Sequence, residues 1–166
     1  MKTKFLLFIL AISLVLVSCA ADERTSVSDA ELLSEAIDSY IENEISGSES
    51  VPLMVEYHNS ILTAITYEIQ SYDLSKGTMN VEFTYIDVLR LADSVTAPNI
   101  SEAEYYSVCI EKIHSQEYET VTEVIPITFE TDENGYSIIG SDLLTNVLSG
   151  GVLNYYLELL EEIGNG

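Results

Sequence analysis

The apolar residues of this chain repeat with two different periods, and the order of those periods constrains the fold more than any other feature of the sequence. Helical spacing of three or four residues recurs in five stretches, 29–46, 52–61, 102–116, 143–148 and 152–163. Alternation at every second residue, which is typical of half-buried strands, marks two pairs of stretches, 65–70 with 79–85 and 120–131 with 136–140. The short connection within each pair indicates an antiparallel hairpin.

The order is therefore helix, helix, hairpin, helix, hairpin and a closing helical segment. Because each hairpin has only one apolar face, helices must cover that face. We predict an α+β fold in which helices pack on one face of a four-stranded, mainly antiparallel, curved sheet. The stretch 89–97 is ambiguous, and we interpret it as one helical turn before Pro98.

Local signals mark where some of these elements begin or are interrupted. Ser28 and Ser101 are each followed three residues later by a glutamate, Glu31 and Glu104, which is the pattern of a capping box at the start of a helix. Pro126 has no backbone N–H to donate, so we expect an edge or a bulge at that point of the third strand.

Residues 1–18 have the character of an export signal. Lys2 and Lys4 precede an apolar run over 5–17, which rises only about 20 Å as a helix and is too short to span a hydrocarbon core of about 30 Å. A charged start, a short apolar run and small residues at its end are typical of a secretory signal.

The run ends in Leu16-Val17-Ser18-Cys19, which resembles the lipobox of bacterial lipoproteins. In that family the cysteine thiol receives a diacylglycerol and the chain is cut just before it. The resemblance implies a signal peptide over 1–18 and a lipid on Cys19. The alternative is an ordinary secretory signal, in which Cys19 is removed or stays a free thiol.

Lipidation would anchor the protein at the extracytoplasmic face of the cell membrane, because paired acyl chains hold a protein there stably. Residues 19–27 lack apolar periodicity and are interpreted as a flexible tether. Residues 28–166 are long enough for a single α+β domain with one core.

Charge excludes one class of partner. All 28 acidic residues and four of the six basic ones follow residue 18, which leaves a formal charge of −24 without His. Such a chain is repelled by nucleic acid, so we expect no nucleic-acid partner. The acidity could recruit cationic ligands or divalent metal, but we favour a solvated face that keeps an exported domain soluble.

Cys109 has no partner in the chain if Cys19 carries lipid, so the fold must form without a disulfide. It lies between Val108 and Ile110 in a helical pattern, and no basic residue precedes it at helical spacing. We therefore interpret it as a buried, inert thiol rather than a nucleophile.

The pattern over 65–155 resembles the small lipid-anchored domains of unknown function found in single-membrane bacteria. The segments that carry the resemblance are YEIQSYDLSKGTMNVEFTYIDV, ITFETDENGYSIIG and DLLTNVLSGGVL. Such domains are similar to the cystatin-like, nuclear-transport-factor-like α+β cone, in which a curved sheet wraps a helix. Tyr136 stands where those domains usually have Trp. The resemblance implies a fold and an address but no activity, because that fold carries many functions.

Asp87, Tyr67 and Tyr85 form the candidate catalytic set. Asp87 continues the alternation of Tyr85 and should point toward the core side, where a desolvated carboxylate could act as a base. The two tyrosines share the inward faces and could donate to an oxyanion. The structural alternative is a rim carboxylate that accepts backbone N–H groups, with tyrosines filling the core.

No metal or cofactor is expected from the sequence. The turn 132–135 is too compressed for a calcium loop, and His58 and His114 have no partner at ligand spacing. We expect a non-catalytic binding or accessory module for a small apolar ligand or a protein partner. The alternative is a small isomerase or hydrolase that uses Asp87, and a weaker one is a regulator of an extracytoplasmic enzyme.

Overall fold

The structure, a computed structural model, describes residues 28–45, 52–95, 99–133 and 135–164. The signal peptide, the tether and Cys19 lie outside these residues. The described elements, in chain order, are α2 (Asp29–Ile45), α3 (Pro52–Thr63), β1 (Thr66–Asp73), β2 (Thr78–Ile86), α4 (Val88–Val95), α5 (Glu102–His114), β3 (Thr120–Asp132), β4 (Gly135–Ile139), α6 (Asp142–Leu148) and α7 (Val152–Gly164). The predicted α+β class is confirmed.

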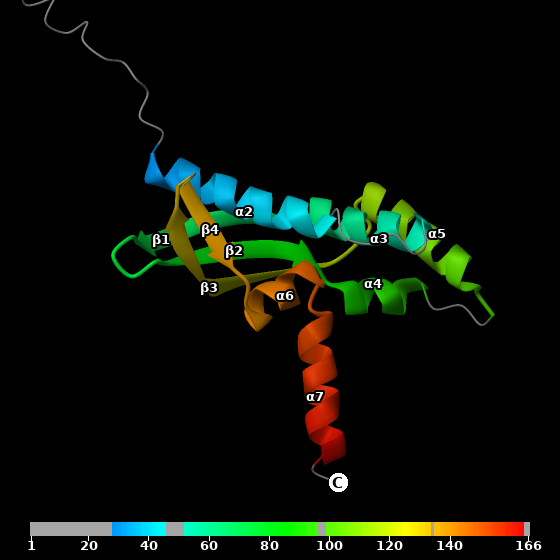
Figure 1. Cartoon of the computed structure of the whole chain (residues 1–166). Coiled ribbons are helices and arrows are strands. Elements are labelled where there is room, and N and C mark those ends of the chain that lie inside the picture. The colour runs from blue at the N-terminus through cyan, green and yellow to red at the C-terminus, as the bar shows by residue number, and fades with distance from the viewer. Residues whose placement is uncertain (1–27, 46–51, 96–98, 134, 165–166) are drawn as a thin grey trace, which may run out of the picture.

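The four strands form one curved, antiparallel sheet in the order β1-β2-β3-β4. Helices α4 and α5 are inserted between β2 and β3, and the sheet still keeps sequence order (Figure 1). The two hairpins pair as expected, with Tyr67 opposite Phe83 and Phe129 opposite Ile138. Since β2 and β3 pair over their whole shared length, they form the centre of the sheet.

One face of the sheet is buried by α2 and α6. The inward row of β2 is almost fully shielded, whereas Thr78 and Asn80 of the other parity are exposed. The cluster on this face joins both helices to both central strands: Leu33, Ile37, Ile41, Leu62, Met79, Val81, Phe83, Tyr85, Ile125, Ile127, Phe129, Leu144, Val147 and Leu148. Figure 1 shows α2 lying along the sheet. Helices thus cover one face, as the alternation predicts.

A second apolar cluster lies where α3, α4 and α5 pack together beyond the end of the sheet (Figure 1). Its buried members are Ile61, Ile86, Val88, Leu91, Val95, Cys109 and Ile113. The free thiol of Cys109 is fully buried here, in agreement with its interpretation as a structural residue.

Both predicted capping boxes are present. The Ser28 hydroxyl accepts from the Glu31 N–H at 3.2 Å, and the Ser28 N–H donates to Glu31 Oε2 at 2.7 Å. The Ser101–Glu104 pair makes the same reciprocal bonds at 3.3 and 3.0 Å. Each box satisfies amides that the first turn of a helix leaves without a partner.

Two local expectations need correction. The ambiguous stretch 89–97 is interpreted from the sequence as one turn, but its described residues 89–95 belong to the eight-residue helix α4, which begins at Val88. Pro126 pairs with Asn80 without a shift in register, so a bulge there is wrong. The edge expectation fits, because β4 pairs only from Thr128 onward and leaves Pro126 with one neighbouring strand. The register shift lies in β1, between Ile69 and Ser71.

Helix α7 leads away from the rest of the molecule (Figure 1). Its start is held by Asn146, a side chain only 2 % exposed, whose Oδ1 accepts from the Asn154 N–H at 2.9 Å. Tyr155 and Tyr156 on this helix are exposed rather than part of the core. No helix of the described ranges is long and apolar enough to cross a membrane.

Candidate functional site

Asp87 caps a helix. It immediately precedes α4, and its Oδ1 accepts from the Arg90 N–H at 3.0 Å, which is the N-cap to N3 bond. Its own N–H donates to the carbonyl of Glu119 at 3.0 Å. The side chain is half-buried. These contacts match the structural alternative of a rim carboxylate that accepts a backbone amide.

Tyr67 is tied to α2. Its hydroxyl lies 2.7 Å from Asp38 Oδ1 and 3.0 Å from the carbonyl oxygen of Ser34. The ring packs against Phe83 with 5.8 Å between centroids. Burial, followed by the hydrogen bond to Asp38, raises the pKa of the Tyr67 phenol. The residue therefore stays protonated at neutral pH and fixes α2 onto the sheet.

Tyr85 donates to a carboxylate that the sequence analysis did not select. Its hydroxyl lies 2.7 Å from Oε1 of Glu123, the residue opposite Phe83 in the sheet. Burial first, then this hydrogen bond and the charges of Glu123 and Asp87, raise the pKa of Tyr85. The polar interruption at position 123 in an otherwise apolar inward row was the available signal. The hydrogen bond from Tyr85 explains why a glutamate stands at this inward position.

Of the three predicted catalytic residues, only Asp87 and Tyr85 lie near each other, and each of the three makes a structural contact of its own. Asp87 is close enough to influence Tyr85 electrostatically, whereas Tyr67 is bonded to a different helix. Asp87 and Tyr85 line none of the five cavities described in the structure. The inward face between sheet and helices is filled by side chains such as Phe83 and Leu33.

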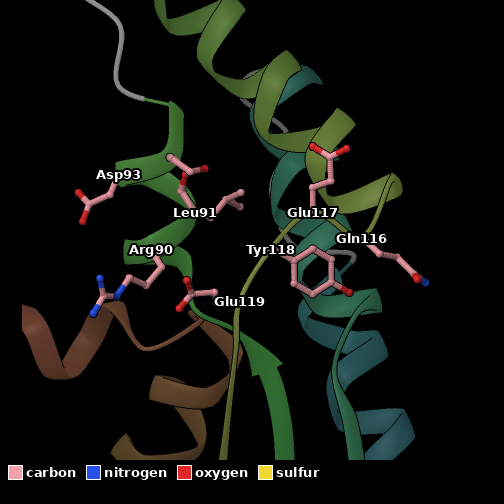
Figure 2. Close-up of a pocket in the computed structure, with 8 residues that line it drawn as sticks. Arg90, Leu91, Asp93, Gln116, Glu117, Tyr118 and Glu119 are labelled. Atoms are coloured by element: carbon pink, nitrogen blue, oxygen red, sulfur yellow. The ribbon is translucent and has the colours of Figure 1, made fainter.

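A cavity of about 550 Å³ lies between α4 and the segment that joins α5 to β3. Its lining carries one guanidinium and three carboxylates, from Arg90, Asp93, Glu117 and Glu119, all exposed. Figure 2 shows that the side chains do not converge, since Arg90 and Asp93 extend to one side and Gln116 to the other. Exposed charges that point apart bind a ligand weakly in water.

A smaller cavity, of about 350 Å³, is mainly apolar and is formed by α3 with contributions from the end of α2 and from α5. Its lining residues are Ile45, Met54, Val55, Tyr57, His58, Asn59 and Tyr106. We call it the α3–α5 cavity. An apolar wall with a few polar groups is the usual composition of a small-molecule site.

Tyrosines form one wall of this cavity. The ring of Tyr57 lies 5.3 Å from that of Tyr106 and 6.4 Å from that of Tyr105, measured between centroids. Burial raises the pKa of Tyr57, and burial together with Cys109 raises the pKa of Tyr105 to about 12. Burial also raises the pKa of the Cys109 thiol. These side chains are therefore neutral at physiological pH.

Asn59 also lines the α3–α5 cavity, but its side-chain oxygen lies beneath the cavity surface. Its Oδ1 is shielded from water and has no hydrogen-bond partner, the one such buried side-chain atom among the described residues. A buried acceptor without a partner costs about 1–3 kcal/mol and calls for an explanation. Sequence reasoning missed this site, because His58 and Asn59 lie among other polar residues of a short amphipathic helix and match no binding motif.

No group of three or more His, Cys, Asp or Glu side chains that could hold a metal ion occurs in the part of the chain that the structure describes. His58 lies in the cavity wall, and His114 is exposed at the end of α5. No protein-family model, curated protein or solved structure matches this chain.

Proposed function

We propose that this protein is a lipid-anchored extracytoplasmic lipoprotein whose domain binds a small apolar ligand in the α3–α5 cavity without catalysis. The address rests on the export signal and on the sequence Leu16-Val17-Ser18-Cys19. The observation that carries the binding function is the mainly apolar cavity of about 350 Å³, whose lining includes Met54, Val55 and Tyr57. A cavity of about 150 Å³ already binds benzene.

In this proposal the sheet is a scaffold and does not itself hold the ligand. A cystatin-like cone would hold a ligand between sheet and helix, but that space here is occupied by core side chains. The α3–α5 cavity lies outside it, among residues of the second apolar cluster such as Tyr57. Because α3 and α5 are held by that cluster, the cavity wall is fixed before any ligand enters.

The address is tested by mass spectrometry of the protein from native membranes. We expect an N-terminus at Cys19 that carries a diacylglycerol thioether, and we expect Cys19→Ser to prevent both the modification and membrane retention. An N-terminus with unmodified sulfur, or wild-type protein free in the culture fluid, would refute the anchor.

Ligand binding is tested with a cavity-filling variant. Val55→Phe places a larger ring in the lining of the α3–α5 cavity, and Val124→Phe makes the same change on the exposed sheet face, where Val124 is 54 % exposed. Val55→Phe should abolish binding of small aromatic probes and Val124→Phe should leave it unchanged. Equal binding by both variants would place the ligand elsewhere.

The enzymatic alternative keeps its own test. Asparagine is as good an N-cap as aspartate, so Asp87→Asn should retain the melting temperature. Any hydrolase or isomerase turnover that this variant loses at unchanged stability would favour the enzyme, whereas unchanged turnover would exclude Asp87 as its base.

A further inference from the structure

We infer that α7 (Val152–Gly164) is an arm by which this protein docks onto a second protein, whose surface is apolar and rimmed with lysine or arginine. The inference does not involve the α3–α5 cavity, so its test is separate from that of the proposed ligand binding. Three features of the helix carry it, namely its exposed apolar side chains, its fixed direction and its charge.

The exposed apolar surface of the described residues is concentrated on α7. Four large apolar side chains of this helix are exposed, and we call them the α7 stripe: Tyr155, Tyr156, Leu157 and Leu160. They are four of the nine large apolar side chains exposed in the described ranges. Apolar side chains that are exposed singly need no explanation, whereas a contiguous group marks an interaction site.

The stripe is broad, and the helix that carries it lacks support. Consecutive residues of a helix are about 100° apart, so Tyr155, Tyr156 and Leu157 together extend over about 200° of its circumference. Leu160 lies one turn further on, between the directions of Tyr156 and Leu157. The helix has 13 residues and extends away from the core (Figure 1). Because a helix of this length is marginal in water without packing, a surface that covers the stripe would stabilise α7.

Buried contacts at the start of α7 fix its direction. The side chain of Asn146 is buried, and its Oδ1 accepts from the Asn154 N–H at 2.9 Å. The backbone carbonyl of Asn146 accepts from the Gly151 N–H at 2.9 Å. The carbonyl of Gly150 accepts from the Val88 N–H, the first of α4, at 3.1 Å. The helix is therefore held away from the core in one orientation, and an arm ordered in advance loses less freedom on binding.

Charge decides which partner fits the arm. Helix α7 contains Glu158, Glu161 and Glu162, and the chain has no lysine or arginine after Lys112. A second copy would bring three more glutamates to the contact, and the formal charge of −22 on each chain would oppose it. Helices that lie on membrane surfaces carry lysine or arginine on their polar face, which α7 lacks. A protein with basic residues around an apolar surface complements both the stripe and the glutamates.

A helical peptide of this chemistry serves as the probe. Four repeats of KIAALKE have an apolar seam of isoleucine and leucine that is flanked by lysine, and four repeats of EIAALEK keep the seam but flank it with glutamate. The full-length chain is reconstituted in phosphatidylcholine vesicles, and the anisotropy of each labelled peptide is read against empty vesicles. The lysine peptide should bind and the glutamate peptide should not. A lysine peptide that does not bind would overturn the inference.

One pair of variants tests the stripe at constant charge. Leu160→Ala preserves the helix and should weaken binding of the lysine peptide about tenfold, the lower end of what burial of a leucine side chain contributes. Leu74→Ala makes the same change at an exposed leucine in the turn between β1 and β2 and should leave the affinity unchanged. Equal affinities of the two variants would show that the stripe makes no contact.

A second pair tests the local charge. The triple variant Glu158→Gln, Glu161→Gln and Glu162→Gln should weaken binding about threefold more than a triple variant of α2 that loses the same charge. The α2 control changes three exposed glutamates in the same way, Glu35, Glu42 and Glu44. Equal losses would show that the peptide is attracted to the acidic chain as a whole and not to α7.

Other occupants of the arm would give different results. We expect the α7 amides to exchange rapidly with deuterium in vesicles without peptide, and slow exchange that Leu160→Ala abolishes would assign the stripe to the bilayer. We expect no energy transfer between copies labelled with two dyes in shared vesicles, and transfer that the same variant abolishes would assign the stripe to a second copy. Either result would overturn the inference and leave the α3–α5 cavity unaffected.

Discussion

Replacing Asn59 by leucine should stabilise this protein, although the residue lines the α3–α5 cavity. Leucine has the same γ-branched outline, although its methyl groups are larger than the amide atoms, and the half-buried site leaves room on its open side. The change removes the buried Oδ1 that has no partner, and it leaves the backbone carbonyl of Asn59 free to accept from Thr63 Oγ1 at 2.9 Å as before. Nothing else that the structure assigns to this side chain is lost.

The magnitude follows from two contributions. An unpartnered buried polar group costs about 1–3 kcal/mol, of which we take the lower part because the residue is half-buried as a whole. Leucine also exceeds asparagine in helix propensity by about 0.4 kcal/mol. The sum is about 1.5 kcal/mol, which corresponds to about 3–6 °C in melting temperature for a domain of this size.

Urea denaturation followed by circular dichroism measures the effect in the absence of ligand. Asn154→Leu on α7 is the matched control, because it makes the same exchange at an exposed helical position and reports propensity alone. A gain for Asn59→Leu no larger than that of the control would show that Oδ1 costs nothing. A loss of stability would show that the asparagine side chain makes a stabilising contact within the protein or that the larger leucine does not fit there.

Three further predictions concern the backbone and pH. Gly150 has φ of +65°, and a Cβ there would overlap Val88 Cγ2, so Gly150→Ala should cost about 3 kcal/mol in urea denaturation. Gly151→Ala, whose Cβ meets only ordinary contacts, should cost about 1 kcal/mol, and equal losses for the two variants would show that the overlap with Val88 costs nothing. Gln116 follows the C-cap of α5 and has φ of +61°, a position where glycine is usual. Gln116→Gly should therefore raise the free energy of unfolding by about 0.5–1 kcal/mol, measured in a thermal melt, and a lower stability would show that the glutamine makes a stabilising contact. Burial is the main cause that raises the pKa of Tyr105 from 10.0 to about 12. The protonated phenol therefore contributes its full stability below pH 10, and this contribution is lost as the pH rises through 12. A Tyr105→Phe variant should show a shallower decline of the urea midpoint over that range, and an unchanged decline would show that Tyr105 does not cause it.

Most of the fold could be predicted because it depends on local periodicity. The alternation in β2 and β3 places Phe83 and Ile127 on one face whatever the topology, and the capping pattern at Ser101 specifies the start of α5 without tertiary help. The helix α4 was underestimated because its eight residues are too few for a clear period, and its start is fixed by contacts from Glu119 and Gly150, which are distant in sequence.

The candidate site could not be predicted in the same way. Asp87 has the parity of an inward residue, but the strand ends at Ile86 and the next peptide begins a helix, which turns that carboxylate into a cap. Glu123 breaks the apolar row in the sequence, and only the pairing of β2 with β3 shows that it lies beside Tyr85.

The sequence by itself determined the order of elements, the face of the sheet that is buried and the strong acidity of the chain, because each of these depends on spacing or composition alone. Only the tertiary structure decided where a ligand could enter. The α3–α5 cavity exists because Tyr106, from the helix inserted between β2 and β3, meets Tyr57 and Asn59 of an earlier helix. No local pattern encodes that meeting, since it follows from packing between segments that are remote in the chain.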